Sequence, residues 1–451
     1  MTGDPSGGQP NILLVTIDSL RADHVYSNAA ETPSLDRLVE RGRSYSTAFA
    51  QGPFTTFSMP SLFTSQYPSD LQYTELTEST IGVSIGDNPT IGTVLCENGY
   101  ETAGFHSNPL LSNLFGFDRG FDVFDARLPM DGIDALSGRT KVLADKLLRL
   151  VRKHPYLPAE KLTQRGLDWL DSRDGDEPFF LWLHYMDVHG PYQPKSGNSY
   201  WNKYRGERLW RKAVTSPTEI TDDERETLRA WYREEVTYTD RCLGRFLDGL
   251  RERDQFADTV VAVTADHGEQ FGEHGTYSHP HQLYDELLHV PLVFAGPDCD
   301  STTVDEIVEL TDIAPTLATM AGSSVPDAFV GDPLPGFDDR GHEPADDRTS
   351  GDGVAIAEAN LVPDYAGCVR TDRWKYIRDG DSELLFDLSA DPTEQTDIGD
   401  DEEARRAELA EHLDDHLAVD GRSAGSDGSV ATVDIDGQGT EERLKDLGYL
   451  E

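Results

Sequence analysis

The segment NILLVTID occupies residues 11–18, and the segment TVVAVTADH occupies residues 259–267. Each is a continuous apolar run that ends in side chains able to bind a metal, which are Asp18 in the first segment and Asp266 and His267 in the second. Uninterrupted apolar runs of this length fit strands whose two faces are both covered. We therefore predict that the two runs are buried strands of one sheet.

The rest of the chain alternates short apolar runs with longer segments of helical period. This alternation predicts an α/β/α sandwich, with a mostly parallel central sheet and helices on both faces. Two further buried strands are predicted at Phe179–His184 and Val290–Ala295. Helices are predicted at Ser34–Arg41, Lys141–Lys153, Lys161–Asp171, Asp222–Arg253 and Asp312–Ala321, with Gly322 ending the last of them.

The composition changes near residue 325, because Pro, Gly and Asp dominate from there to residue 353 and predict a linker or surface excursion. We expect a catalytic α/β domain over residues 10–325 and a smaller C-terminal α+β subdomain over residues 354–420. Residues 421–440 hold few large apolar side chains, so a mobile tail is expected over residues 421–451. Within the subdomain we predict a strand at Val354–Ala357, an antiparallel hairpin of Cys368–Arg378 and Glu383–Leu388 around the turn Asp379–Asp381, and a terminal helix at Asp400–Leu417.

The charge balance is strongly acidic, since 83 Asp and Glu face 39 Lys and Arg and give a formal net charge of −44. Such a surface repels a polyanion, so a nucleic-acid partner is not expected. The acidic residues are spread along the chain, as in proteins of salt-loving organisms, and do not form a discrete tail. We interpret the charge as an adaptation to a salty environment.

The N-terminal residues do not predict export, because MTGDPSGGQP has neither a basic nor an apolar signal region. No apolar run of about 18 residues predicts a membrane span. The four cysteines are scattered and form no CxxC pair, which fits free thiols, although a bridge between two of them stays open. We expect a cytoplasmic protein.

Polar residues at the ends of the predicted strands are the candidates for a site. Asp187 and His189 follow the strand that begins at Phe179, just as Asp18 follows the first strand. Ligands of doubly wound sheets bind beyond the carboxyl ends of the strands, so these distant residues are expected to converge there. The alternative is that Asp18 forms a turn or helix cap and that Asp266 belongs to an ordinary turn.

The segment GPFTTFSMPSLFTSQYP, residues 52–68, supplies a candidate nucleophile. Ser58 is predicted to cap a helix that has Pro60 in its first turn, which puts Thr55 just before a helix N-terminus. A hydroxyl at such a position beside a divalent metal can attack an ester, because the metal lowers its pKa. The alternative is an ordinary Ser/Thr-rich loop.

These segments, taken together and in order, resemble those of a known family. NILLVTIDSLRADH, TPSLDRLVERG, the block from Thr55 to Pro68, FLWLHYMDVHGPY, VTADHGEQFGEHG, YDELLHVPLVFAG, LTDIAPTLATMAG and VRTDRWKYIRDGDSELLFDLSADPTE are similar to the characteristic segments of sulfatases, in the alkaline phosphatase superfamily. The resemblance covers roughly residues 10–397 and implies hydrolysis of an ester.

The resemblance implies roles for individual residues. It makes Asp18, Asp266 and His267 metal ligands and puts the nucleophile, itself a ligand, at Thr55. The metal would be one divalent ion, and oxygen with nitrogen ligands suit Mn²⁺, Ca²⁺, Mg²⁺ or Zn²⁺.

Two histidines are implied to contact the substrate. His189 falls where the family has a histidine that contacts sulfuryl or phosphoryl oxygens. His279 falls where the family has a Lys or His near the leaving group, as a general acid or as a positive contact.

The chain departs from the sulfatase pattern at two positions. Ser19 stands where sulfatases have a second acidic residue, and Thr55 stands where they carry the Cys or Ser that is oxidised to formylglycine. In sulfatases that Cys or Ser is followed by x-Pro-x-Arg. A register beginning at Ser58 would put Leu62 in place of the Arg, so Thr55 is preferred. A Thr nucleophile is similar to that of phosphodiesterases and phosphoglycerol transferases of the same superfamily, so the substrate is expected to be a sulfate or a phosphate ester of a small molecule or glycan.

Other interpretations stay open. One is a transferase that passes the group to a sugar or glycerol hydroxyl, and another is a catalytically weak glycan-binding protein. Glu269, Glu273 and His274 are expected either to orient the metal ligands or to lie in a surface loop. His106 and Asn108 are expected to line the crevice. A packing or surface role is expected for His281 and His289, and Lys375 is expected in a structural strand.

Overall fold

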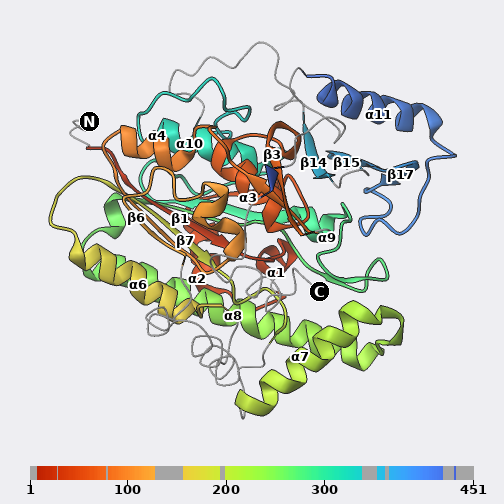
Figure 1. Ribbon diagram of the computed structural model, residues 1–451, viewed down its shortest axis with the longest axis horizontal. Coiled ribbons are helices and arrows are strands. Elements are labelled where there is room, and N and C mark those ends of the chain that lie inside the picture. Colours follow the sequence, from red (N-terminus) through yellow and green to blue (C-terminus); the bar gives the residue numbers. More distant parts are fainter. Residues whose placement is uncertain are drawn as a thin grey trace.

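A nine-stranded sheet runs through the centre of the molecule (Figure 1). The computed structural model describes residues 8–27, 29–77, 80–126, 156–192, 199–337, 353–360, 365–419 and 431–432. The strands of this sheet are β1 (Asn11–Ile17), β2 (Arg43–Phe49), β5 (Glu101–Phe105), β6 (Val123–Asp125), β7 (Phe179–Tyr185), β8 (Thr259–Ala265), β11 (His289–Ala295), β12 (Thr302–Val304) and β13 (Val308–Glu309). Their order is β12-β2-β11-β8-β1-β7-β5-β6, with β13 paired to β2.

The sheet is mostly parallel, as the sequence predicts. Strand β1 is parallel to both of its neighbours, β7 and β8, and β5 continues the parallel set between β7 and β6. Strand β11 runs against both β8 and β2. The connection from β8 to β11 contains only the two-residue strands β9 (Gln270–Phe271) and β10 (Tyr277–Ser278) and the short helix α9 (Asp285–Leu288). It therefore provides no crossover helix to carry the chain back for parallel pairing.

Helices cover both faces of the sheet (Figure 1). One face carries α3 (Thr55–Thr64), α4 (Ile91–Glu97) and α10 (Ile313–Met320), and the other carries α2 (Pro33–Arg41), α6 (Ala159–Ser172) and α8 (Asp222–Glu252). The predicted helices match these bounds to within a few residues, and Gly322 follows α10 with φ +69° as a left-handed stop. The helix predicted at 141–153 lies outside the described residues. The remaining helices are α1 (Asp23–Tyr26), α7 (Ser199–Thr215) and α11 (Glu403–Leu417).

The central strands are buried because their apolar side chains face helices on both sides. Every residue of β7 and of β8 is buried. Trp182 of β7 has no exposed surface and packs edge-on against Phe63 of α3, with 4.6 Å between ring centroids. Burying an aromatic side chain of this size stabilises the fold by roughly 2–3 kcal/mol.

A second, antiparallel sheet forms the C-terminal part of the described chain. Its order is β14 (Val354–Asn360), β15 (Tyr365–Thr371), β16 (Trp374–Asp379) and β17 (Ser382–Asp387), and α11 packs on it (Figure 1). The prediction of one strand over Cys368–Arg378 is wrong, because the chain turns between β15 and β16. Thr371 closes this turn, since its hydroxyl oxygen accepts a hydrogen bond from the Trp374 N–H at 3.0 Å.

Of the expected tail, only the two residues of β18 (Ala431–Thr432) are described. They pair with β3 (Gln72–Thr77), which itself pairs with β4 (Thr80–Ser84). Residues 338–352 of the expected linker also lie outside the described residues. All four cysteines are free thiols. No helix in the described ranges combines the length and apolarity that a membrane crossing requires.

Lys375 links the second sheet to the start of α9, the helix that precedes β11 of the first sheet. Its side chain is fully buried, and its Nζ lies 2.6 Å from Asp285 Oδ1 at the start of α9 and 2.8 Å from Glu394 Oε1. Burial alone would raise the pKa of Asp285, but the charges of Lys375 and Arg370 outweigh it and hold that pKa below its ordinary range. The ammonium therefore acts as a structural link, as the sequence predicts for this strand.

We expect Lys375→Met to lower the free energy of unfolding by about 3–5 kcal/mol, because it leaves the buried carboxylate of Glu394 without its cation and Asp285 with Arg370 alone. Urea unfolding measures the change. The loss should be smaller at pH 5 than at pH 8, since an unpaired carboxylate can take up a proton. Arg373→Met removes an ion pair with Asp387 whose arginine is 58% exposed, so it should cost at most about 1 kcal/mol. Equal losses in the two variants would contradict a structural role for Lys375.

Candidate active site

The polar residues that follow β1 and β8 lie side by side. The two strands are adjacent and parallel, with Ile17 paired to Ala265, so Asp18 is brought beside Asp266 and His267. His267 Nε2 lies 3.8 Å from Asp18 Oδ1 and 3.6 Å from Asp266 Oδ2. All three side chains are fully buried, and one ligand atom from each lies within 4.8 Å of the others.

Thr55 lies at the same point. Its Oγ1 donates a hydrogen bond to Asp266 Oδ2 at 2.7 Å and is 3.5 Å from both Asp18 Oδ2 and His267 Nε2. The four residues predicted to hold a metal are therefore in mutual contact. Their donor set is two carboxylates, one imidazole and one hydroxyl, which fits a divalent cation.

Helix α3 positions Thr55, although it begins earlier than predicted. Ser58 does not cap the helix, because the helix starts at Thr55 and the Ser58 hydroxyl donates to the carbonyl of Phe54 at 3.1 Å. All ten residues of α3 are buried, so apolar packing on every side favours helix over the whole segment, and Pro60 is accommodated inside it. Thr55 is thus the first helical residue, where backbone N–H groups favour an anion.

Neighbouring side chains fix the orientation of the Asp18 carboxylate. The Ser19 hydroxyl donates to Asp18 Oδ1 at 2.9 Å, and Asn108 Nδ2 donates to Asp18 Oδ2 at 3.3 Å. The backbone N–H of Ser19 donates to Asp266 Oδ1 at 3.1 Å. Ser19 holds a left-handed conformation with φ +60°, which Tyr232 supports by donating its hydroxyl to the Ser19 carbonyl at 2.7 Å. Ser19 therefore orients both carboxylates.

The orientation of His267 is also suited to metal binding. Its Nδ1–H donates to the carbonyl of Gly268 at 2.8 Å, which leaves Nε2 facing the carboxylates. Gly268 is required here, because a Cβ would lie 2.0 Å from the carbonyl oxygen of Glu286. Burial alone would lower the pKa of His267, but Asp266 and Asp18 outweigh it and raise that pKa.

The pKa of Asp18 reflects the surrounding histidines. Burial alone would raise this pKa, but His189, His184 and His267 outweigh it and hold the pKa of Asp18 below its ordinary range. The carboxylate is therefore ionised and available as a ligand.

His189 and His279 lie beside the four residues. The His279 ring is 4.7 Å from that of His267 and 4.9 Å from that of His189, measured between centroids. His279 Nδ1 lies 3.3 Å from Glu269 Oε1. Burial, helped by His267, lowers the pKa of His279 to about 3. Burial raises the pKa of Glu269 to about 7, against the opposing charges of His189 and His267.

Other polar residues that the sequence singled out have contacts elsewhere, and His281 and His289 pack as expected. Asp187 Oδ2 accepts the Ala159 N–H at 2.7 Å, at the start of α6. Glu273 forms ion pairs with Arg21 at 2.9 Å and Arg229 at 3.1 Å. His274 stacks on Tyr284 and lies 3.2 Å from Glu286, His281 packs on Phe54, His289 stacks on Phe49, and His106 is buried between Phe124 and Trp182.

Sequence reasoning missed two contributors. His184 Nε2 lies 3.4 Å from Asp18 Oδ2, and its Nδ1 contacts the Thr16 hydroxyl at 2.8 Å. Tyr192 donates its hydroxyl to Glu269 Oε2 at 2.9 Å. His184 could have been found, because a histidine inside the apolar run FFLWLHY must have a polar partner in a buried strand.

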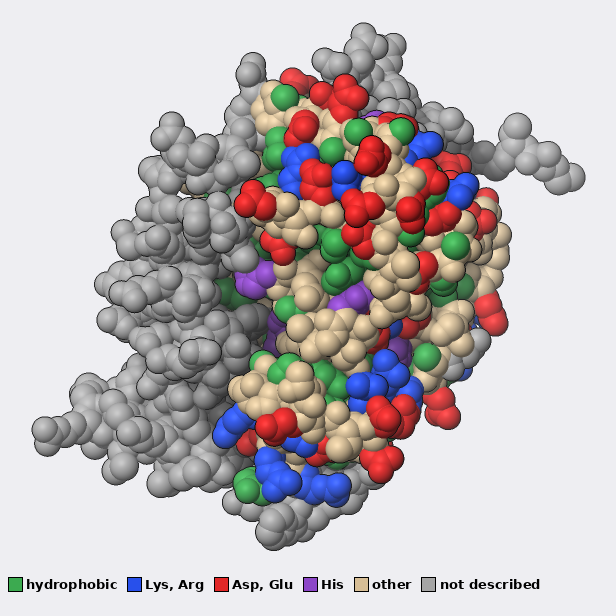
Figure 2. Space-filling model, turned by 90° about the vertical axis from the view of Figure 1, so that its right-hand side faces the viewer, with side chains coloured by type: hydrophobic (Ala, Val, Ile, Leu, Met, Phe, Trp, Pro, Cys, Tyr) green, Lys and Arg blue, Asp and Glu red, His purple; other side chains and the backbone are tan. Residues whose placement is uncertain are grey.

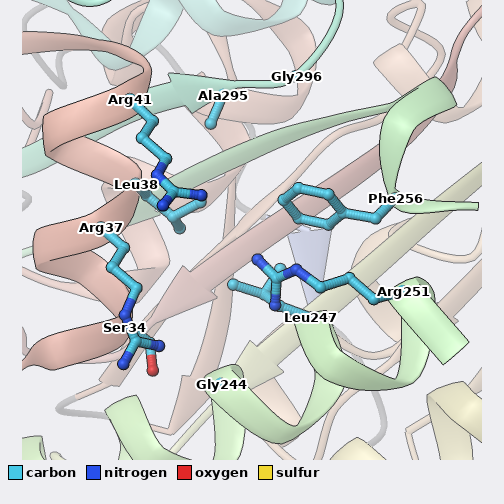
Figure 3. A pocket seen from close by; sticks show the side chains of 10 residues that line it. All are labelled: Ser34, Arg37, Leu38, Arg41, Gly244, Leu247, Arg251, Phe256, Ala295 and Gly296. Atoms are coloured by element: carbon cyan, nitrogen blue, oxygen red, sulfur yellow. The ribbon is translucent and has the colours of Figure 1, made fainter.

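A cavity of about 80 Å³ at another part of the molecule contains none of the predicted site residues (Figure 3). It lies between α2 and the end of α8, near the edge of the sheet where β8 begins, whereas the residues described above follow the end of β8. The side chains of Arg37, Arg41 and Arg251 surround it (Figure 3).

Comparisons with known proteins show the family of this chain. The sulfatase family model matches residues 10–323, and the model of the N-sulphoglucosamine sulphohydrolase C-terminal region matches residues 272–420. Arylsulfatase K of Bos taurus is 26% identical over 90% of this chain and 81% of its own length. Choline-sulfatase of Rhizobium meliloti (strain 1021) is 23% identical over 87% of this chain and 83% of its own length.

Solved structures share the fold. Phosphonate monoester hydrolase of Agrobacterium radiobacter superposes with a TM-score of 0.70 at 21% identity, covering 91% of this chain and 96% of that one. BT4656, solved with its substrate D-glucosamine-2-N,6-O-disulfate, gives a TM-score of 0.66 at 20% identity, covering 91% of this chain and 97% of that one. The chain belongs to the sulfatase family, in the alkaline phosphatase superfamily. It is a hydrolase that acts on sulfuric or phosphoric ester bonds.

We expect Asp18→Asn to weaken Mn²⁺ binding by at least about 100-fold, because the substitution removes a charged ligand from a fully buried set. Isothermal titration calorimetry measures the affinity. The matched control is Glu286→Gln, in a second group of residues, His274, Glu286 and Glu394, whose ligand atoms also lie close together. If Glu286→Gln abolished binding and Asp18→Asn left it intact, the metal site would be the second group.

Proposed function

We propose that this protein hydrolyses a sulfate or phosphate ester by attack of the Thr55 hydroxyl, with one divalent metal held by Asp18, Thr55, Asp266 and His267. The observation that carries the proposal is the position of Thr55 Oγ1, which lies between 2.7 and 3.5 Å from atoms of the other three residues. When bound, a divalent cation would lower the pKa of the Thr55 hydroxyl and offset the negative charge of the ester oxygens.

At this site the reaction would proceed through two successive displacements. Thr55 donates its hydroxyl proton toward Asp266 Oδ2, and its oxygen bonds to the sulfur or phosphorus while the bond to the ester oxygen breaks. The departing alkoxide takes up a proton from His279 or from solvent. In the second displacement a water oxygen bonds to the sulfur or phosphorus, and the water returns a proton to that same donor. The bond to Thr55 breaks, and Thr55 regains its own proton from Asp266. The products are an alcohol and sulfate or phosphate.

His189 and His279 are the groups that would contact the substrate. His279 lies beside the ring of His267 and the carboxylate of Glu269, so its neutral ring can hold the leaving oxygen by a hydrogen bond. It can deliver a proton to that oxygen when the negative charge of the substrate raises its pKa. The His189 ring lies against that of His279, where it can contact a non-bridging oxygen.

The unmodified hydroxyl of Thr55 favours a phosphate ester over a sulfate ester. A covalent ester on Thr55 has no second hydroxyl on the same carbon to expel the bound group, so only attack by water releases it. The relatives named above include sulfatases and a phosphonate monoester hydrolase, which supports both chemistries as candidates.

We expect Thr55→Ala to lower kcat for aryl esters by at least about 1,000-fold, since it removes the nucleophile. Activity is measured with Mn²⁺ on aryl sulfate and on aryl phosphate mono- and diesters, and the phosphate esters should react faster. Thr56→Ala is the matched control, because Thr56 is the next residue of the same helix, and it should keep at least about half of the activity. Full activity of Thr55→Ala would overturn the mechanism.

The role of His279 can be measured through the leaving group. If His279 protonates the leaving oxygen, His279→Gln should slow esters of poorly acidic alcohols by about 100-fold or more and barely slow a nitrophenyl ester. If the histidine is only a positive contact, both esters should slow to a similar degree. His281→Gln is the control, since His281 packs on Phe54 and should leave both rates unchanged.

A further inference from the structure

Strand β7 carries a buried histidine, His184, that the proposed reaction does not use. Its side chain has no exposed surface. Other histidine side chains reach the surface near the middle of one face of the molecule (Figure 2), where water can complete their hydrogen bonds. At His184 only protein atoms can do so, and a buried polar atom without a partner is destabilising. The contacts of this ring therefore have structural or functional consequences.

The register of the central sheet places His184 on the same face as the candidate metal ligand Asp18. His184 is paired with Thr16 across the parallel strands β7 and β1, so their side chains point the same way. Alternate residues of a strand share a face, which adds Asp18, two residues after Thr16. Trp182 joins them, because it lies two residues before His184 and packs on Phe63 of α3.

A line of polar contacts runs along this face from Trp182 to Asp18. The Trp182 Nε1–H donates to the Thr16 hydroxyl oxygen at 3.0 Å, and that hydroxyl lies 2.8 Å from His184 Nδ1. At the far side of the ring, His184 Nε2 lies 3.4 Å from Asp18 Oδ2. In the part of the chain that the structure describes, no other polar atom is paired with this nitrogen. All four side chains are fully buried.

The contacts of Thr16 decide which nitrogen of His184 carries the proton. An indole N–H can only donate, so the Thr16 oxygen accepts from Trp182 and its own proton stays available. The acceptor within reach is His184 Nδ1, which can accept only when it carries no proton. The ring proton is then on Nε2, where it faces the Asp18 carboxylate. The opposite tautomer would turn a lone pair toward a carboxylate.

This proton would help to fix the orientation of the Asp18 carboxylate. Asn108 Nδ2 donates to the same oxygen, Oδ2, at 3.3 Å, and the Ser19 hydroxyl donates to Oδ1 at 2.9 Å. The two contacts to Oδ2 are longer than an ordinary hydrogen bond of about 2.9 Å, so each holds that oxygen only weakly. Acting together in a space without water, they can fix it. Groups behind a ligand carboxylate commonly orient it in this way.

We propose that His184 is a positioning residue for the metal ligand Asp18, and that Thr16 and Trp182 select the tautomer in which it acts. The inference rests on the proposed function for the role of Asp18, and it adds the device that holds this carboxylate in its binding orientation. The alternative is a purely structural role, in which the three side chains only satisfy one another inside the sheet.

The test compares His184→Gln with His184→Asn. Both variants replace the ring by an amide, but the Gln nitrogen can reach the position of Nε2, whereas the Asn nitrogen reaches only that of Nδ1. Mn²⁺ affinity is measured by isothermal titration calorimetry. Urea unfolding of the metal-free proteins measures stability, and hydrolysis of a nitrophenyl ester is followed in parallel.

We expect His184→Asn to weaken Mn²⁺ binding by about 10- to 100-fold, and His184→Gln to weaken it by less than about threefold. The two variants should lose similar amounts of stability, because both replace a buried ring by an amide. Equal Mn²⁺ affinities of the two variants would overturn the inference, since a purely structural histidine gives no reason for the atom near Asp18 to matter more.

The tautomer is measured in the metal-free protein by NMR of isotope-labelled histidine nitrogens. The signals of His184 are identified by their absence from His184→Gln. We expect the proton on Nε2 in the native protein and in Thr16→Ser, which keeps the hydroxyl. Thr16→Val has the same shape without the hydroxyl, so it should show a mixture of both tautomers and weaker Mn²⁺ binding. A proton on Nδ1 in the native protein would overturn the inference.

Failure of the proposed function would have a different signature. If the native protein bound Mn²⁺ through Asp18 but cleaved no ester, the proposed reaction would be wrong and this inference would stand, because neither metal affinity nor the tautomer depends on turnover. If Asp18→Asn left Mn²⁺ binding intact, both would be wrong.

Discussion

The parallel pairing of β1 with β8 is the constraint on which the rest of the site depends. It fixes Ile17 opposite Ala265 and so forces the Asp18 and Asp266 carboxylates into one fully buried space. Two buried carboxylates repel each other strongly unless positive charge and hydrogen bonds offset the repulsion. Hydrogen bonds from Ser19 and the imidazole of His267 supply part of that offset. A divalent cation would supply the remainder, so the pairing of the two strands and the proposed metal depend on each other.

Ser19 stands where the resemblance to sulfatases implies a second acidic residue, and its contacts show what occupies that position in this chain. Ser19 donates its hydroxyl to Asp18 and its backbone N–H to Asp266, so the residue that replaces an acidic ligand orients the two carboxylates that are left. A site with fewer acidic ligands carries less negative charge, which suits a mixed oxygen and nitrogen set such as this one with His267. Thr55, at the first position of α3, would complete the proposed ligand set with a neutral hydroxyl. The departures from the sulfatase pattern at Ser19 and Thr55 thus belong to one altered centre.

The central strands and the position of the candidate site could be predicted from the sequence. Apolar runs that end in Asp18 and in Asp266-His267 identify two strands and also the edge of the sheet where their ends meet. The direction of β11 could not be predicted, since a buried apolar run has the same pattern in either orientation. The start of α3 was mistaken because Ser58 is a good cap in isolation, whereas burial of the whole segment extends the helix back to Thr55. Asn108 is expected in the crevice, but its bond to Asp18 depends on tertiary packing that no local pattern encodes.

The central claim is that four side chains, distant in sequence, share one cation. A crystal structure of the protein with Mn²⁺, with data collected at the manganese absorption edge, tests it most directly. The account predicts one anomalous peak within about 2.0–2.4 Å of ligand atoms from Asp18, Thr55, Asp266 and His267. A peak at His274, Glu286 and Glu394 instead, or none beside Thr55, would contradict it.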